Sequence, residues 1–433
     1  MGAVFAFGVV MLLIAVGVPV AFAFAGMGLV LAWIYSVDIS SLMTTGFWSV
    51  NSVILMALPF FIMTGYLMQA SGMAVCLVEF VDSLVGRLKG GHGAVLIVVC
   101  GVLGAISGTA TAAVASIGTV MISPLEERGY PRAYTSGLLG VSSLVSILIP
   151  PSITMILFAV VTRQSVAACF LSTVVPGILL MILLCIVNAV MSRSFVNPRI
   201  ESPKLLGSRI NVITRSTIVA FPALLMPLII LGGIYGGVFT PTEAAAVTVI
   251  YAIPVGAFVY KGLSPGKLVE SLAQAAETTG VIITILLFSF ITGRIYTLEG
   301  IPQQLTEFMV GMFDNKLLIL LVVNLLLIFL GIVLEDVILT VVVSPLLLPV
   351  MVNIGVHPVQ FGAIVGTSVV IAANSPPTAP ILYMACRIGN VRAVDAMRPA
   401  LIFMIFAALP VQLITSYWPP LSLYLPGVLG YLD

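Results

Sequence analysis

Charged residues are scarce in this sequence. Lysine, arginine, aspartate and glutamate make up 8% of the 433 residues, whereas an ordinary soluble domain carries about 25%. The formal net charge is +1, which leaves no basic surface to attract a polyanion. This composition excludes a soluble globular protein, a disordered chain and a coiled coil, and we expect no nucleic-acid partner.

The motifs of metal centres and enzymes are absent as well. The five cysteines have no CxxC spacing, and two histidines cannot form a multi-histidine metal site. The sequence contains no HExxH, P-loop or GxGxxG motif, and no catalytic triad is visible in it. Because the cysteines are scattered through apolar stretches, we interpret them as buried hydrophobic residues. We therefore expect neither an enzyme nor an organic cofactor.

Long hydrophobic runs dominate the chain instead. Hydrophobic residues make up 61% of it, and the mean hydropathy is +1.24. No charged residue lies between Asp38 and Glu79 or between Asp336 and Arg387, and a membrane-spanning helix needs roughly 20 apolar residues. A transmembrane barrel would instead show segments of about ten residues with alternating polarity. The sequence predicts an all-α polytopic membrane protein surrounded by lipids.

Apolar runs bounded by charge, glycine or proline locate the spans. Residues 3–35 would extend about 50 Å as one helix, too long for a single crossing, so we predict two spans there. The other predicted spans are 53–72, 91–123, 132–161, 166–192, 210–232, 241–260, 277–298, 317–349, 357–386 and 399–418. Residues 299–316 predict an amphipathic surface helix. The loop 193–215 carries five basic residues and one acidic residue, which places it in the cytoplasm.

Two of these segments, 91–123 and 317–349, are too long for one crossing and are interrupted near the middle. The interruptions are Ser107-Gly108-Thr109 and Glu335-Asp336. The basic loops can all face the cytoplasm only if both segments enter and leave the membrane on the same side. Both segments are therefore predicted to be re-entrant helical hairpins.

An internal repeat follows the two hairpins. The pattern Gly-x-Ser followed by Pro-Pro occurs within 140–151 and again, 226 residues later, within 366–377. Because proline lacks an N–H group, each Pro-Pro leaves carbonyls without helical partners, which a membrane tolerates only where they line a cavity or bind a ligand. The number of spans between the two copies places them in opposite orientations across the membrane, so they form an inverted repeat. Inverted repeats with broken helices are typical of secondary transporters.

Polar residues gather at the hairpin tips and helix breaks. Hydroxyls and free carbonyls are good sodium ligands, helix N-termini attract anions, and acids inside a membrane indicate function. The candidates are Ser107, Gly108, Thr109 and Thr111 at the first tip, Ser142, Ser143, Ser146, Pro150, Pro151 and Ser152 at the first break, Glu335 and Asp336 at the second tip, and Ser368, Asn374, Ser375, Pro376, Pro377 and Thr378 at the second break. Close helix packing, simple kinks and a solvated acidic loop stay open as alternatives. Glu243, by contrast, follows Thr240 in a capping-box pattern that predicts a structural role.

The sequence resembles the large membrane subunit of tripartite ATP-independent periplasmic (TRAP) transporters along nearly its whole length. The matching stretches are GAISGTATAAVASIGTVMISPLEERGY at 104–130, ILIPPSI at 147–153, GGIYGGVFTPTEAAAV at 232–247 and FLGIVLEDVILTVVVSPLLLPVMVNIGVHPVQFG at 329–362. The resemblance implies an elevator-type member of the ion-transporter superfamily that imports a small organic anion with sodium across the bacterial inner membrane. It also implies a periplasmic substrate-binding protein and a small four-helix membrane subunit as partners.

The same resemblance divides the chain into scaffold and transport parts. It implies scaffold helices in 1–90 and 166–298, transport-domain repeats in 91–165 and 317–390, the surface helix 299–316, and a C-terminal helix in 391–433. At least two sodium ions are expected, with Ser107, Gly108, Thr109, Ser146, Ile149, Pro151, Glu335, Ala372 and Ser375 as sodium candidates. The substrate candidates are Thr111, Ser143, Ser152, Asp336, Asn374, Pro377 and Thr378.

Departures from the family pattern bear on the substrate. Ser143 and Ser146 stand where the family usually has glycine, and Asn374 replaces an apolar residue. These changes suggest a substrate other than the commonest dicarboxylates or sialic acid, such as a sulfonate. A stand-alone elevator carrier without a binding protein, an intramembrane enzyme that uses Glu335 or Asp336, and a passive channel are the alternatives.

Overall fold

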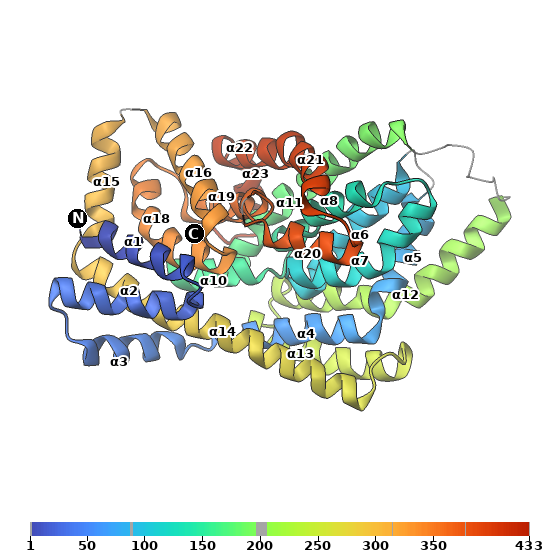
Figure 1. The fold of residues 1–433 in the computed structure, drawn as a ribbon. Helices are drawn as coiled ribbons and strands as arrows, with labels where there is room; N and C mark the ends of the chain where they lie inside the picture. Colours follow the sequence, from blue (N-terminus) through green and yellow to red (C-terminus); the bar gives the residue numbers. More distant parts are fainter. Residues whose placement is uncertain (1, 87–89, 196–205, 314, 377, 433) are drawn as a thin grey trace.

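Every regular element in the described part of the chain is a helix (Figure 1). The computed structural model describes residues 2–432 apart from 87–89, 196–205, 314 and 377. Within these ranges, eight helices are long and apolar enough to cross a membrane, or nine if one bent pair counts as a span. The predicted all-α polytopic architecture is therefore confirmed.

The amino-terminal region contains two helices, at 39–50 and 73–85, that the sequence does not predict. Its helices are α1 (Gly2–Ala15), α2 (Val20–Tyr35), α3 (Ile39–Val50), α4 (Ala57–Ser71), which follows the short turn Ile54–Met56, and α5 (Met73–Val85). The two helices within 3–35 are as predicted. Helix α3 was not predicted; it begins at Asp38, whose carboxylate accepts hydrogen bonds from the Ser40 and Ser41 amides at 3.2 and 3.0 Å.

The first predicted hairpin is formed by two helices that contact each other. They are α6 (Gly91–Ser107) and α7 (Ala110–Glu127). The chain reverses at Gly108, whose φ of 64° favours glycine, and the Thr109 hydroxyl caps α7 by accepting from the Ala112 amide at 3.3 Å. The helix that follows is broken as predicted: α8 (Arg132–Ser143) and α9 (Val145–Leu148) are bent by 44° from α10 (Ile153–Thr162).

The second half repeats this order of elements. Helix α16 (Lys316–Val333) leads to Glu335. The returning arm of the hairpin is helical and comprises α17 (Asp336–Ile338), η5 (Leu339–Val343) and α18 (Ser344–Asn353). The second broken helix comprises α19 (Pro358–Ala372) and α20 (Pro380–Gly389). Both arms of this hairpin are long enough to cross a membrane on their own, so its re-entrant course stays a prediction.

The helices between and after the two halves complete the fold. They are α11 (Val166–Met191), α12 (Leu206–Tyr235), α13 (Pro241–Pro254), η4 (Val255–Val259), α14 (Pro265–Leu298), α15 (Ile301–Met312), α21 (Ala393–Phe403), η6 (Met404–Ala408), α22 (Leu409–Tyr417) and α23 (Pro420–Val428). The capping box predicted for Glu243 is confirmed, because Thr240 and Glu243 bond each other's amides at the start of α13. The predicted cytoplasmic loop 193–215 lies partly outside the described residues.

Helix α14 differs from its predicted span, and the C-terminal region is more than one helix. The span was predicted to start at residue 277, because three charged residues precede or mark that position: Lys267, Glu270 and Glu277. Helix α14 instead begins at Pro265, and Ser264 is its N-cap residue. After residue 391, the chain forms α21 and α22, joined by the π-helical segment η6, and then α23 after Pro419.

The helices fall into two sets, which meet where α4 and α5 pack against α6. In one set, α14 packs against α2, α3 and α4, α13 packs against α4 and α12, and α5 packs against α12; Figure 1 shows α14, in yellow, running along this side of the molecule. In the other set, α8 packs against α7, α20 and α21, and α19 packs against α16 and α22. Helix α11 has its main contacts with α6, α10, α19 and α23, so it packs with the second set although the predicted division groups it with the scaffold.

A buried hydrogen-bond network joins α16, α19 and α22. The Gln412 side-chain amide donates to Asn324 Oδ1 and to the Ser368 hydroxyl, the latter at 2.7 Å. Ser416 also donates to Asn324 Oδ1, at 2.9 Å. All four side chains are almost fully buried, where an unpaired polar group is costly, so the network holds the second broken helix to its neighbours.

Replacing Gln412 with leucine is expected to lower the free energy of unfolding by about 1–3 kcal/mol, because Asn324 and Ser368 lose a buried partner. Gln303→Leu on the exposed face of α15 is the matched control, and a change within about 0.5 kcal/mol is expected there. The apparent melting temperature of the purified protein in detergent measures both. Equal melting temperatures for the two variants would contradict the structural role of the network.

Candidate functional site

A cavity of about 800 Å³ lies where the hairpin tips and helix breaks converge. Residues from both hairpin tips and both broken helices line it, together with residues of α2, α4 and α14. Its walls therefore come from both sets of helices. Of the sequence-predicted residues, Gly108, Thr109, Thr111, Glu335, Asp336, Ala372 and Thr378 line the cavity.

Two helix N-termini border the cavity. Ala110 and Thr111 in the first turn of α7, and Ile153 and Thr154 in the first turn of α10, are among its lining residues. The first amides of a helix have no intrahelical acceptors and carry the positive end of its dipole. This side of the cavity therefore favours a negatively charged group.

The first hairpin is pressed closely against the first broken helix. A side chain at Gly104 would overlap the Cα atom of Ser146, and a side chain at Gly108 would overlap the Pro151 carbonyl oxygen. The Ser146 hydroxyl donates to the Thr109 carbonyl at 3.1 Å and to the Ser143 carbonyl. The hairpin tip and the break therefore form one rigid unit.

The second hairpin meets the second broken helix in the same way. A side chain at Gly331 would lie 2.5 Å from the Cβ atom of Ala372, and Ala372 follows Ser146 by 226 residues, the offset of the sequence repeat. The Thr378 hydroxyl donates to the Ile332 carbonyl, which ties the break to the hairpin. The repeat thus extends from sequence to a pair of equivalent contacts.

Several predicted hydroxyls lie behind the cavity wall and bond to backbone groups. Ser107 donates to the Leu103 carbonyl at 3.1 Å, Ser143 to the Gly140 carbonyl at 2.8 Å, and Ser375 to the Ile371 carbonyl at 2.8 Å. Ser152 caps α10 by accepting from the Met155 amide. A hydroxyl that donates in this way keeps lone pairs that can coordinate a cation. Ser107, Ile149, Pro151 and the other predicted residues of this layer do not line the cavity itself.

Asn374 lies inside the protein between the second break and α8. Its amide nitrogen donates to the Gly140 carbonyl at 3.1 Å, and its Oδ1 atom has no hydrogen-bond partner among the described residues. The Ser142 hydroxyl is likewise buried and unpartnered in the described part of the chain. Asn374 is not among the residues that line the cavity, so its role in substrate binding stays a prediction, and Pro377 lies outside the described residues.

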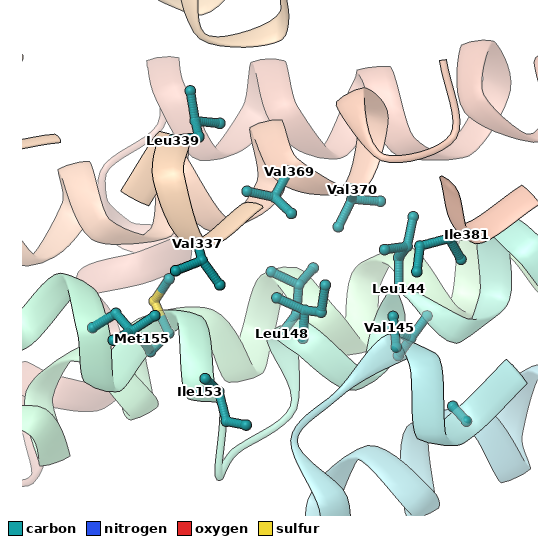
Figure 2. Close-up of a cluster of buried hydrophobic side chains, with 14 of the residues drawn as sticks. Leu144, Val145, Leu148, Ile153, Met155, Val337, Leu339, Val369, Val370 and Ile381 are labelled. Carbon is teal, nitrogen blue, oxygen red and sulfur yellow. The ribbon is translucent and has the colours of Figure 1, made fainter. Parts of the chain in front are cut away.

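Apolar side chains of both halves meet at the wall of the cavity. Figure 2 shows Leu144 of the first half beside Ile381 of the second, and Leu148 near Val369. Leu144, Leu148 and Val369 are almost fully buried. This packing fixes the two breaks relative to each other, because close-packed side chains transmit displacement rather than absorb it.

The sequence did not predict the polar wall that α4 and α14 contribute. Tyr66, Gln274, Glu277 and Thr278 line the cavity, and the Tyr66 and Thr278 hydroxyls are hydrogen-bonded at 2.9 Å. The position of the charged and polar residues inside the long helix α14 could have indicated this wall.

Carboxylates are the only charged residues among the described residues that line the cavity. They are Glu277, Glu335 and Asp336, and the second tip supplies two of them. No group of three or more histidine, cysteine, aspartate or glutamate residues that could hold a metal ion occurs in the described ranges. The oxygen-rich tips suit a hard cation rather than a soft transition metal.

Comparison with known proteins identifies the family. The profile of the "Tripartite ATP-independent periplasmic transporter, DctM component" family matches residues 7–421. The chain is 33% identical over 394 residues to the isethionate TRAP transporter permease protein DctMQ of Oleidesulfovibrio alaskensis, covering 90% of this chain and 61% of that longer protein. It is 31% identical to the C4-dicarboxylate TRAP transporter large permease protein DctM of Pseudomonas aeruginosa, covering 87% of each.

A further relative and a solved structure agree with this. The sialic acid TRAP transporter large permease protein SiaM of Vibrio cholerae is 33% identical, with 88% of each chain covered. The crystal structure of the YdaH transporter of Alcanivorax borkumensis superposes with a TM-score of 0.63 over 89% of this chain and 91% of that one, at 14% identity, and so has a similar fold. The chain belongs to the DctM family of TRAP transporter large permease subunits, and it is a multi-pass membrane transporter rather than an enzyme.

Proposed function

We infer that this permease imports a small organic anion, a carboxylate or a sulfonate, together with sodium across the bacterial inner membrane. The observation that carries the proposal is the cavity between the two hairpin tips and the two helix breaks. Helix N-termini on one side of it attract an anion, and the carboxylates of the second tip attract sodium. The relatives named for isethionate, C4-dicarboxylates and sialic acid support an organic-anion substrate.

Two sodium sites related by the repeat account for the driving force. A negative-inside membrane potential opposes import of an anion by about 2.3 kcal/mol per charge per 100 mV, so a monovalent anion needs at least two sodium ions to enter downhill. The first site comprises Ser107, Gly108, Thr109, Ser146, Ile149 and Pro151. The second comprises Glu335, Ala372 and Ser375.

Transport proceeds by movement of one set of helices against the other. The hairpins and broken helices, with α11 and α21–α23 packed on them, form the moving unit. Helices α2, α4, α5 and α12–α14 form the scaffold. Because the cavity has walls from both sets, sliding the moving unit past α4 and α14 exposes the substrate to the other side of the membrane, as in an elevator.

A periplasmic substrate-binding protein and a small four-helix membrane subunit complete the transporter. Membership of the DctM family supports both partners. A stand-alone carrier of the same fold is the alternative, and it predicts uptake by this chain alone. Co-purification of the small subunit with the tagged chain would support the tripartite transporter. Failure of the small subunit to co-purify, together with uptake by this chain alone, would support the stand-alone carrier.

Uptake into proteoliposomes tests the proposed function. The complete transporter is reconstituted, and uptake of radiolabelled succinate, isethionate, sialic acid, taurine or β-alanine is measured with a binding protein for that compound outside. An inward sodium gradient is expected to drive accumulation of one of them, whereas an equal potassium gradient gives none. Flux that is independent of sodium would contradict coupled transport and support a passive channel.

A further inference from the structure

The charges on the scaffold wall of the cavity do not suit a simple anion. Glu277 lines the cavity from α14, and no lysine, arginine or histidine lies among the described residues that share this lining. Glu277 also takes part in none of the ion pairs found in the described ranges. An anion that enters the cavity therefore meets an unneutralised carboxylate of like charge.

Sodium at the second tip does not remove this conflict. Glu335 and Asp336 lie on the hairpin, whereas Glu277 lies on α14, in the other set of helices. Neither proposed sodium site uses Glu277. Its charge is therefore left for the cargo to meet.

The neighbours of Glu277 are acceptors as well. Gln274 lies on the preceding turn of α14, and the hydroxyls of Tyr66 and Thr278 form a hydrogen-bonded pair beside it. The amide oxygen and the two hydroxyls can accept hydrogen bonds from a cationic donor. The first half of the chain thus contributes two helix N-termini to the cavity, and the scaffold contributes a carboxylate among hydrogen-bond acceptors.

We propose that the cargo carries an ammonium group as well as its acid group, and that Glu277 binds the ammonium. This inference rests on the proposed function and narrows its substrate class to amino carboxylates and amino sulfonates. The acid group lies toward the first turns of α7 and α10, and the ammonium donates to the Glu277 carboxylate. Glu277 is then a specificity-determining residue that separates an amino acid from the hydroxy acid of the same size.

Two pairs of probes isolate the ammonium group. Taurine and isethionate differ only in an ammonium in place of a hydroxyl, and β-alanine and 3-hydroxypropionate differ in the same way. The apparent melting temperature of the full chain in sodium chloride is measured against the concentration of each probe. We expect the ammonium member of each pair to stabilise the protein at about tenfold lower concentration than its partner, as one charge-assisted hydrogen bond allows.

The Glu277→Gln variant is expected to remove that preference. Glu307→Gln is the matched control, because Glu307 is exposed on α15, lies outside the cavity lining and loses the same charge; it should keep the wild-type preference. The inference would be overturned if neither taurine nor β-alanine stabilised the protein, whether or not the hydroxy acids did. It would also be overturned if the preference for the ammonium probes were the same in wild type and Glu277→Gln. The proposed function fails separately, if sodium drives uptake of none of the carboxylates and sulfonates tested, taurine and β-alanine included.

Discussion

Replacing Glu335 with glutamine is expected to raise the sodium concentration for half-maximal uptake about tenfold or more. Glu335 lies at the second hairpin tip and lines the cavity, and it is the charged member of the second proposed sodium site. A unit charge about 4 Å from an ion contributes about 4 kcal/mol at an effective dielectric constant of 20. Loss of only a third of that energy corresponds to the tenfold change.

The measurement is the sodium dependence of uptake in proteoliposomes at a fixed substrate concentration. Glu307→Gln is the control, because Glu307 is exposed on α15 and away from the cavity; its sodium dependence should match the wild type. Asp336→Asn supplies a second comparison, since the neighbouring carboxylate lines the same cavity. An unchanged sodium dependence in Glu335→Gln would remove Glu335 from the site and leave the family assignment intact.

Replacing Gly104 with alanine is expected to reduce both stability and uptake. The added methyl group would overlap the Cα atom of Ser146, so the hairpin must move away from the first break. Overpacking of this kind costs about 1–3 kcal/mol. The displacement also separates the Thr109 carbonyl from the Ser146 hydroxyl that donates a hydrogen bond to it. We expect sodium-driven uptake to fall about tenfold or more, because a loss of about 1.4 kcal/mol of binding free energy corresponds to a factor of ten.

Gly331→Ala tests the equivalent contact of the second half, where the methyl group would collide with Ala372. Gly293→Ala on α14 is the control, because a side chain there has open space. Alanine at that helical position should stabilise the protein by up to about 1 kcal/mol. The melting temperature and the uptake rate are measured for all three variants. Wild-type stability and uptake in both Gly104→Ala and Gly331→Ala would show that the close contacts have no role.

Local features of the fold could be predicted from the sequence. The scarcity of charge predicted a polytopic helical protein, and the prolines and glycines located the bends and turns at Gly108 and Pro150-Pro151. The capping box at Thr240 and Glu243 was recognisable because it is formed by residues three positions apart. The matching stretches at 104–130 and 329–362 were long enough to indicate the family.

Contacts between distant segments could not be predicted. Hydrophobicity gives the length of a span but not its partners, so the packing of α11 against α6, α19 and α23 was missed. Glu277 was interpreted only as the edge of a span, because nothing in the local sequence shows that α14 faces the hairpin tips. Ser107, Ser143 and Ser152 lie at the tips and breaks, but they bond to backbone groups and do not line the cavity.

Sodium binding to the purified protein is the most direct test of sodium-coupled transport by this permease. The melting temperature is compared in sodium, potassium and choline chloride at equal ionic strength, with neither substrate nor partners present. Sodium at ten times its dissociation constant adds about 1.4 kcal/mol of stability if it binds only the folded state. We expect the melting temperature to rise specifically in sodium chloride, and the rise to be smaller in Glu335→Gln. Identical melting curves in the three salts would contradict it.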